Sequence, residues 1–325
     1  MTHHAEAPNA ETPLQGAELV AANRVAALLS GTAPLGVAFS GGVDSSTLLA
    51  LAIRALGRGH VLAVLGVSPS LAAAERATAH RIAAFLGANL VEVATFECDR
   101  PEYRRNLPNR CFYCKDELFG RISDEVMSRH RLAAVAYGEN ADDARRSDRP
   151  GARAAVAHRV LRPLAEAGID KAGVRRIARA LALPCSEKPP APCLASRIPH
   201  FHEVVPEKLA QIETAEAALR ALGFTELRVR HHGDIARIEL PVGELSRAAA
   251  TPLREAVWRA VSSAGFRFVA LDLAGVQSGA FTLPLVSHES TMVHAATWTS
   301  HTESNAVRTS SSCPPTAAEG RRPGR

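Results

Sequence analysis

Apolar residues along the first half of the chain recur in short runs that alternate with longer amphipathic segments. The short runs predict strands at residues 35–39, 61–67, 90–94 and 133–137. The amphipathic segments predict helices at residues 17–29, 45–56, 70–86 and 115–129. Strands joined by crossover helices are typical of an α/β fold with a doubly wound, mostly parallel sheet, whose ligands bind at the carboxyl ends of the strands.

The second half of the chain has a different pattern. A predicted helix at 171–181 leads into segment 183–199, where five prolines exclude a regular helix. The pattern then predicts a helix, a hairpin of two strands around Gly233-Asp234, a second helix and a third strand, at residues 206–222, 227–231, 235–240, 253–264 and 266–271. We therefore expect a second, smaller α+β domain at the C-terminal end.

Composition refines this division. Ser, Thr, His, Pro and Arg without apolar periodicity predict a disordered tail over 286–325, and residues 1–14 are predicted to be disordered as well. The two predicted domains occupy residues 15–185 and 186–285. Hydrophobic residues make up 46% of the 325 residues and charged residues 22%, which argues against wholesale disorder.

Location and partner class follow from the same composition. No apolar stretch approaches the ~20 residues that span a bilayer, and the first residues lack a signal-peptide pattern, so we expect a cytoplasmic protein without a membrane partner. The formal net charge of +5 permits acidic ligands such as nucleotides but does not require nucleic acid.

The strongest chemical signal lies between the first predicted strand and the helix that follows it. Two glycines allow close approach to phosphate oxygens, and the N–H groups that begin the helix point toward the same anion. The serines add hydroxyl donors, and Asp44 can hold Mg²⁺ against a pyrophosphate. A plain Gly-Ser turn that caps the helix is the simpler alternative. The predicted nucleotide-binding residues are Ser40, Gly41, Gly42, Val43, Asp44, Ser45 and Ser46.

Cysteines supply the second signal, because a reducing compartment makes persistent disulfides unexpected. Cys111 and Cys114 form a C-x-x-C pair that can bind one face of a metal or cluster, act as a redox pair, or be two buried structural thiols. No second C-x-x-C exists to complete a zinc ribbon. Cys193 can supply a third thiolate, which would leave a [4Fe–4S] cluster with one open iron, and Arg197 four residues later can lower a thiol pKa. Spacing alone does not choose among these.

Several motifs together resemble one known family. The loop SGGVDSS is similar to that of the ATP pyrophosphatases called PP-loop enzymes, which belong to the adenine nucleotide α-hydrolase-like proteins. Over about residues 17 to 283, the chain resembles the ATP-dependent sulfur insertases of the LarE type. The motifs are RCFYCK at 110–115, GENADD at 138–143, SDRPGARAA at 147–155, RPLAEAGIDKAGVRRIA at 162–178, KPPAPCLASRIP at 188–199, ALGFTELRVRHHGDIARIEL at 221–240 and LDLAGVQSG at 271–279.

The resemblance implies an enzyme, an AMP-forming sulfur transferase of nickel-pincer nucleotide cofactor synthesis. ATP and Mg²⁺, with Asp44 as a catalytic residue, would adenylate a carboxylate of a pyridinium-dicarboxylate mononucleotide, and Cys193 would then attack the acyl-adenylate. In one version Cys193 gives up its own sulfur. In the other, Cys111, Cys114 and Cys193 hold a [4Fe–4S] cluster that carries an added sulfide, and the presence of all three favours this version.

Further residues are predicted to bind the substrate or shape the site. Arg197, Arg228 and Arg230 can contact substrate phosphate or carboxylates through bidentate hydrogen bonds, although each can equally form an ordinary surface pair. Asp142, Asp143 and Asp148 offer metal or ribose contacts. We also expect a homo-oligomer and transient contact with other proteins of nickel-pincer cofactor synthesis.

Two other functions remain open from the sequence. A tRNA thiolase also combines a PP-loop with a C-x-x-C pair, but it would carry a more basic face and an RNA-binding module, neither of which is evident. A non-catalytic nucleotide-binding protein would keep the loop without the chemistry. Retention of both Asp44 and Cys193 argues against that loss.

Overall fold

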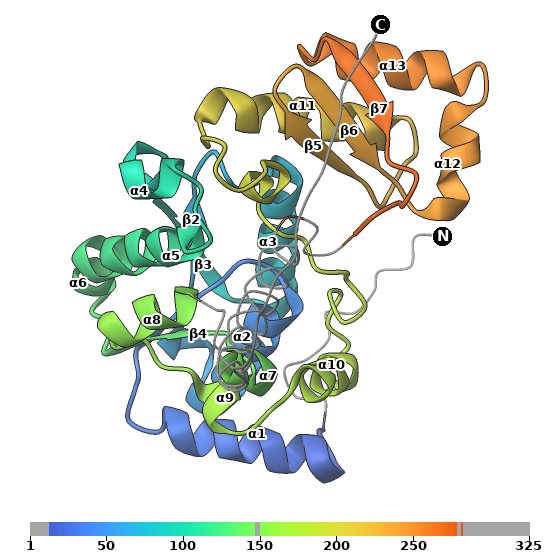
Figure 1. Ribbon diagram of the computed structural model, residues 1–325. Coiled ribbons are helices and arrows are strands. Elements are labelled where there is room, and N and C mark those ends of the chain that lie inside the picture. Colours follow the sequence, from blue (N-terminus) through green and yellow to red (C-terminus); the bar gives the residue numbers. More distant parts are fainter. Residues whose placement is uncertain (1–12, 147–149, 278–280, 282–325) are drawn as a thin grey trace, which may run out of the picture. The chain divides into compact units, whose positions relative to one another are not determined.

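The computed structural model describes residues 13–146, 150–277 and 281 (Figure 1). Every described residue up to 277 belongs to one compact unit. The disorder predicted for 286–325 concerns residues outside the described part, as it does for 1–12, while Leu14 packs into the main apolar core. The predicted boundary between residues 185 and 186 stays a prediction.

The first sheet has four parallel strands in the order β3-β2-β1-β4. These strands are β1 (Leu35–Ala38), β2 (Val61–Val67), β3 (Asn89–Ala94) and β4 (Ala134–Tyr137). Leu35 of β1 aligns with Val61 of β2 on one side and with Ala134 of β4 on the other. The parallel α/β sheet predicted from the alternating pattern is confirmed.

Helices cover both faces of this sheet, which is why its strands are almost continuously apolar. On one face, Ala63 and Leu65 of β2 share a core with α1 (Gly16–Leu29), α2 (Val43–Leu56), α3 (Ala73–Leu86) and α10 (Lys171–Ala180). On the other face, Val64 packs with residues of α5 (Arg110–Arg121), the π-helical segment Ile122–Met127 and α8 (Pro150–Ala157).

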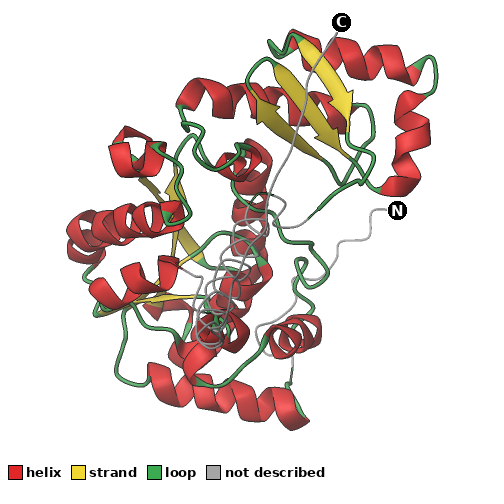
Figure 2. Cartoon of the chain, in the orientation of Figure 1, coloured by secondary structure: helices red, strands yellow, loops and turns green. Residues whose placement is uncertain are grey.

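A second, three-stranded sheet follows in the order β5-β6-β7 (Figure 2). The predicted hairpin is β5 (Arg228–His232) paired antiparallel with β6 (Ile235–Glu239), and β7 (Phe268–Leu271) runs parallel to β6. The sheet has its own apolar core with α11 (Pro206–Ala221), α12 (Val242–Ala249) and α13 (Leu253–Ser263). The predicted smaller α+β element is therefore present.

The structure corrects one element that matters for the site. The helix predicted to begin at Lys115 begins at Arg110 instead, so Cys111 and Cys114 lie on the first turn of α5 rather than in an irregular segment before it. Residues three apart share one face of a helix, so both thiols are presented together. α5 continues through the π-helical segment into α6 (Ser128–His130).

Several short elements were not predicted, because one or two turns leave too little periodicity to detect. They comprise α8, α12 and the helices α4 (Pro101–Arg104), α7 (Ala141–Arg145) and α9 (Pro163–Glu166), with 3₁₀ turns at Arg58–His60, Glu97–Asp99 and Leu194–Arg197. None of the helices in the described ranges is both long and apolar enough to cross a membrane.

One close approach fixes the start of α2 against β4. Gly138 directly follows β4, and a Cβ atom there would lie 2.7 Å from the backbone nitrogen of Ser45 and 2.8 Å from the carbonyl carbon of Asp44. Backbone atoms cannot move aside as a flexible side chain can. Glycine at 138 therefore lets the loop after β1 sit beside β4, where the strand order of the sheet reverses.

We predict that Gly138→Ala destabilises the fold by about 1–3 kcal/mol, the usual range for overpacking. It should also weaken nucleotide binding, because the start of α2 must shift. Thermal unfolding and nucleotide titration measure the two effects. Gly243→Ala is the matched control, since its added Cβ would meet no atom within 4 Å. Equal behaviour of the two variants would contradict the prediction.

Candidate functional site

A cavity of about 400 Å³ brings together two motifs that lie 150 residues apart in the sequence. One wall is the loop after β1, including Ser40 and Asp44, and another is the proline-rich segment that ends at Cys193. The volume is that of a small-molecule site. Cations from several elements also line the cavity, namely Lys171, Arg175, Lys188, Arg197 and Arg220. Three carboxylates, of Asp44, Glu75 and Glu216, line the cavity as well, so the positive charges of the lining outnumber the negative ones and the cavity can accept an anionic ligand.

Hydrogen bonds within the loop after β1 fix the conformation in which several of its residues line the cavity. Gly41 has φ +68°, and a Cβ atom there would lie 2.8 Å from Cα of Ala79, so glycine is required. The Ser45 hydroxyl donates to the Gly42 carbonyl at 3.1 Å and accepts from the Ser40 backbone N–H at 3.3 Å. Ser40, Gly42, Val43 and Asp44 line the cavity, whereas Gly41, Ser45 and Ser46 do not. The latter three shape the loop, and the nucleotide-binding role of all seven stays a prediction.

Asp44 has two partners that the sequence analysis missed. Lys171 Nζ donates to Asp44 Oδ2 at 2.5 Å, and Asn140 Nδ2 donates to Asp44 Oδ1 at 3.1 Å. Asn140 also caps α7, since its side-chain oxygen accepts from the Asp143 N–H. The capping position of Asn140 after a predicted strand was a usable signal. Lys171 gave none, because it is 127 residues from Asp44.

The acidic residues after β4 shape this corner of the site. Asp142 Oδ2 accepts the Lys171 backbone N–H at 2.9 Å, so it positions the first residue of α10. Asp143 Oδ2 accepts from Asn140 at 2.9 Å. Asp148 lies outside the described residues. Of the acidic residues in this corner, Asp44 is the one that lines the cavity, which Glu75 and Glu216 line from other elements. A carboxylate beside substrate phosphates is a usual Mg²⁺ ligand.

The three cysteines of interest lie in one region. Cys193 is exposed at the cavity wall, Cys111 is exposed on α5, and Cys114 is partly buried. Burial raises the pKa of the Cys114 thiol well above its ordinary value, and the nearby charges of Glu97, Cys193 and Cys111 raise it further. Cys114 also packs against the apolar cluster that contains Leu194 and Ala195, the two residues after Cys193. The described residues nevertheless include no group of three or more His, Cys, Asp or Glu side chains arranged to hold a metal ion.

The remaining cysteines have ordinary environments. Cys98 and Cys185 are buried among apolar residues. Burial, with help from the Glu97 charge, raises the pKa of Cys98 to about 11, so its thiol stays neutral at pH 7. Cys313 lies outside the described residues.

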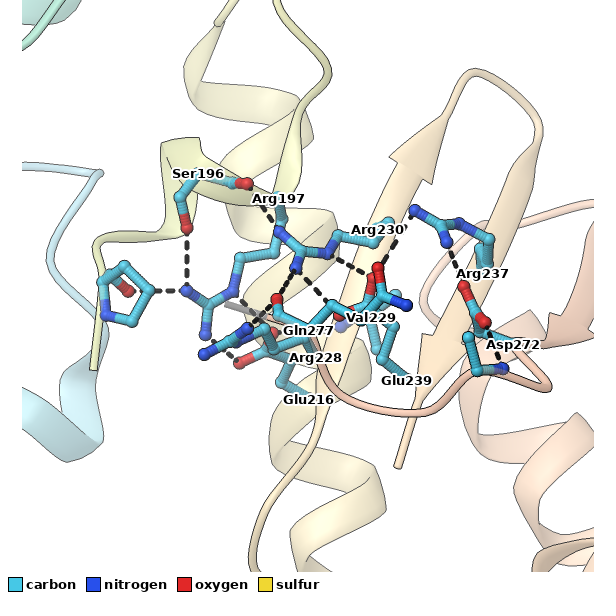
Figure 3. A network of polar contacts seen from close by, with 12 residues as sticks. Ser196, Arg197, Glu216, Arg228, Val229, Arg230, Arg237, Glu239, Asp272 and Gln277 are labelled. Atoms are coloured by element: carbon cyan, nitrogen blue, oxygen red, sulfur yellow. Dashed lines mark hydrogen bonds and ion pairs between the residues drawn. The ribbon is translucent and has the colours of Figure 1, made fainter. Parts of the chain in front are cut away.

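Buried ion pairs hold the part of segment 183–199 around Cys193, called the Cys193 loop below, against the second sheet (Figure 3). Arg197, three residues after the 3₁₀ turn begins, pairs with Glu216 of α11 at 2.9 Å, and both side chains are almost fully buried. Arg197 also donates to the carbonyls of Pro192 at 2.6 Å and Cys193 at 3.3 Å. Removing one member of a buried pair costs about 3–5 kcal/mol, so these contacts define the loop conformation.

Arg228 and Arg230 of β5 belong to the same network. Arg230 pairs with Glu239 at 2.8 Å and donates to the Ser196 carbonyl at 2.9 Å, and both arginines donate to the Gln277 carbonyl (Figure 3). Of the three arginines predicted to bind substrate, Arg197 lines the cavity and the other two do not. Their substrate-binding role stays a prediction.

Comparison with known proteins agrees with this arrangement. The family model of asparagine synthase matches residues 18–159, which include the loop, α3 and the C-x-x-C helix. The chain is 39% identical over 243 residues to an uncharacterized protein of Synechocystis sp., covering 75% of this chain and 90% of that protein. It is 30% identical over 169 residues to an uncharacterized protein of Methanocaldococcus jannaschii, covering 52% of this chain and 64% of that one.

A third relative has a described activity. Over 243 residues, the chain is 35% identical to pyridinium-3,5-bisthiocarboxylic acid mononucleotide synthase of Lactiplantibacillus plantarum, covering 75% of this chain and 87% of that enzyme. The match extends over most of both chains. The chain therefore belongs to the LarE-type family of sulfur insertases within the PP-loop superfamily.

Proposed function

We propose that the protein is an ATP-dependent, AMP-forming sulfur transferase that converts a carboxylate of a pyridinium-dicarboxylate mononucleotide into a thiocarboxylate. The observation that carries the proposal is the single cavity lined by both the loop of Asp44 and Cys193. An activating group and a nucleophile must act on the same carboxylate, so they must share one site. Membership in the LarE-type family supports the identity of the substrate.

The first step is adenylation of the carboxylate. A carboxylate oxygen forms a bond to the α-phosphorus of ATP, and the bond to pyrophosphate breaks. The N–H groups at the start of α2 and the cations Lys171, Arg175 and Lys188 face the cavity in which the phosphates would lie. Fixed donors and positive charges stabilise the negative charge that develops on the leaving pyrophosphate. Mg²⁺, held by Asp44, would neutralise phosphate charge.

The second step is attack by sulfur. The Cys193 sulfur forms a bond to the carbonyl carbon, and AMP leaves with the electrons of the carbon–oxygen bond. A carboxylate is a poor electrophile, whereas its mixed anhydride with AMP has a good leaving group, and a thiolate is a sufficient nucleophile at neutral pH. The exposure of Cys193 at the cavity wall supports this role.

Two sources of the transferred sulfur remain as proposals. In the sacrificial route, loss of the α proton of Cys193 breaks its Cβ–S bond, leaving dehydroalanine in the protein and the thiocarboxylate in the product. In the cluster route, Cys111, Cys114 and Cys193 would hold a [4Fe–4S] cluster that supplies a bound sulfide. Three cysteine thiolates suit a cluster with one open iron. Their arrangement in the described residues is not a ligand set, so no step is derived through the cluster.

The direct test is substrate-dependent ATP cleavage. Under reducing, anaerobic conditions, the pyridinium-dicarboxylate mononucleotide should trigger release of pyrophosphate and AMP in equal amounts. Orthophosphate and ADP should not form. A folded sample that releases pyrophosphate with tRNA but not with the mononucleotide would favour the thiolase alternative. Release with neither would leave a nucleotide-binding protein.

Lys171→Met should lower the rate of pyrophosphate release by about 100-fold, the usual loss when one fixed donor to a developing charge is removed. The reason is its position, where it reaches both Asp44 and the cavity. Steady-state pyrophosphate assays measure the effect. Lys208→Met is the control, since Lys208 donates to the Glu203 carbonyl away from the cavity. A Lys171→Met variant as active as this control would refute the assignment.

Cys193→Ala should abolish thiocarboxylate formation while preserving exchange of pyrophosphate into ATP, because adenylation precedes sulfur attack. Intact-protein mass after one turnover then separates the two sulfur sources. Loss of one sulfur atom, with Cys111→Ala and Cys114→Ala active, indicates the sacrificial route. An unchanged mass together with inactivity of all three variants indicates the cluster route. Sulfur transfer by Cys193→Ala would overturn both.

A further inference from the structure

Arg110 is a buried cation without a carboxylate partner. Its residue is 7% exposed, yet no Asp or Glu among the described residues lies within ion-pair distance of its guanidinium. Two other buried arginines are paired, Arg197 with Glu216 and Arg230 with Glu239, whereas buried Arg228 has no ion pair among the described residues and donates to the Gln277 carbonyl. Burying an unpaired charge is costly, and the guanidinium cannot lose its proton in a protein. The charge at Arg110 therefore requires another explanation.

Neutral hydrogen bonds place this guanidinium against the Cys193 loop. Arg110 Nη1 donates to the Ala195 carbonyl at 3.0 Å and to the Asn106 side-chain oxygen. Asn106 is itself fully buried and donates to the carbonyls of Pro199 at 2.7 Å and His202 at 3.0 Å. The pair thus fastens the segment on both sides of Arg197 to the first turn of α5.

The guanidinium of Arg110 lies between two segments that carry thiols, because Arg110 directly precedes Cys111 on α5 and donates to the carbonyl of Ala195, two residues after Cys193. Burial lowers the pKa of the guanidinium, but Cys193, then Cys111, Tyr103 and Cys114, outweigh burial and raise it. Tyr103 stays neutral at pH 7, because its burial raises the phenol pKa. The positive charge of Arg110 therefore lies beside the segments that carry Cys111 and Cys193. Arg197, which the sequence places nearer to Cys193, is already paired with Glu216.

We propose that Arg110 is a positioning residue of the sulfur site, which fastens the Cys193 loop to α5 and presents an unbalanced positive charge to anionic reactants at Cys193. The inference rests on the proposed function only for the use of that charge in sulfur transfer. In the reaction, the adenylated substrate that must reach Cys193 carries phosphate and carboxylate charges. A cation held beside the sulfur attracts such a reactant.

Paired alkylation rates test the charge without ATP or substrate. Iodoacetate and iodoacetamide are similar in size but differ by one negative charge, so the ratio of their rates at Cys193 cancels the intrinsic reactivity of the thiol. Mass spectrometry of the Cys193 peptide from the full-length chain gives both rates. Arg110→Met should lower the iodoacetate-to-iodoacetamide ratio roughly threefold or more, as expected for loss of one charge several Å away.

Three further variants make the result decisive. Arg110→Lys should largely restore the ratio, and Arg110→Gln, which keeps a donor for the Ala195 carbonyl, should lower it as Arg110→Met does. Arg105→Met removes an exposed charge five residues away and should leave the ratio unchanged. An unchanged ratio in both neutral variants, or an equal fall in Arg105→Met, overturns the proposal. Failure of sulfur transfer with the ratio behaving as expected would instead contradict the proposed function.

Discussion

The buried carboxylate of Glu216 is the contact on which the site depends. It accepts from Arg197 in the Cys193 loop, from Arg220 on its own helix and from the Val229 backbone N–H of β5. One side chain thus joins α11, the second sheet and the loop that carries Cys193. Because its exposure is only 1%, water cannot replace any of these partners cheaply. The Cys193 loop has almost no regular structure, so its conformation depends on the contact with Glu216 rather than on the backbone hydrogen bonds of a helix or sheet.

Much of the fold was predictable because its causes are local. Apolar runs of four to seven residues between amphipathic segments predicted β1 to β4, and two glycines before a helix predicted the loop between β1 and α2. Prediction failed at the C-x-x-C helix, where Pro108 and polar residues conceal a helix start at Arg110. There the apolar face is defined by contacts of Phe119 with β4 and α8, which single-sequence periodicity does not contain.

The types of residue at the site could be predicted from the sequence, but the residues that they contact could not. Asp44 and Cys193 were identified from their motifs, whereas Lys171 and Asn140 were not, because each meets Asp44 only through the order of the sheet. The arginines also show that the contacts of a residue cannot be predicted from its type. A guanidinium suits a phosphate as well as a carboxylate, and only the fold reveals that Glu216 and Glu239 already engage Arg197 and Arg230.

The ion pair between Lys171 and Asp44 determines which charged ligands the loop after β1 attracts. The two charges neutralise each other, so the loop offers little attraction to a lone cation. In the proposed reaction, a metal-bound nucleotide would bring both a cation for the carboxylate and phosphates for the lysine, so each member of the pair would exchange its partner. Such a site would distinguish a metal complex from its separate components, since only the complex compensates both charges at once.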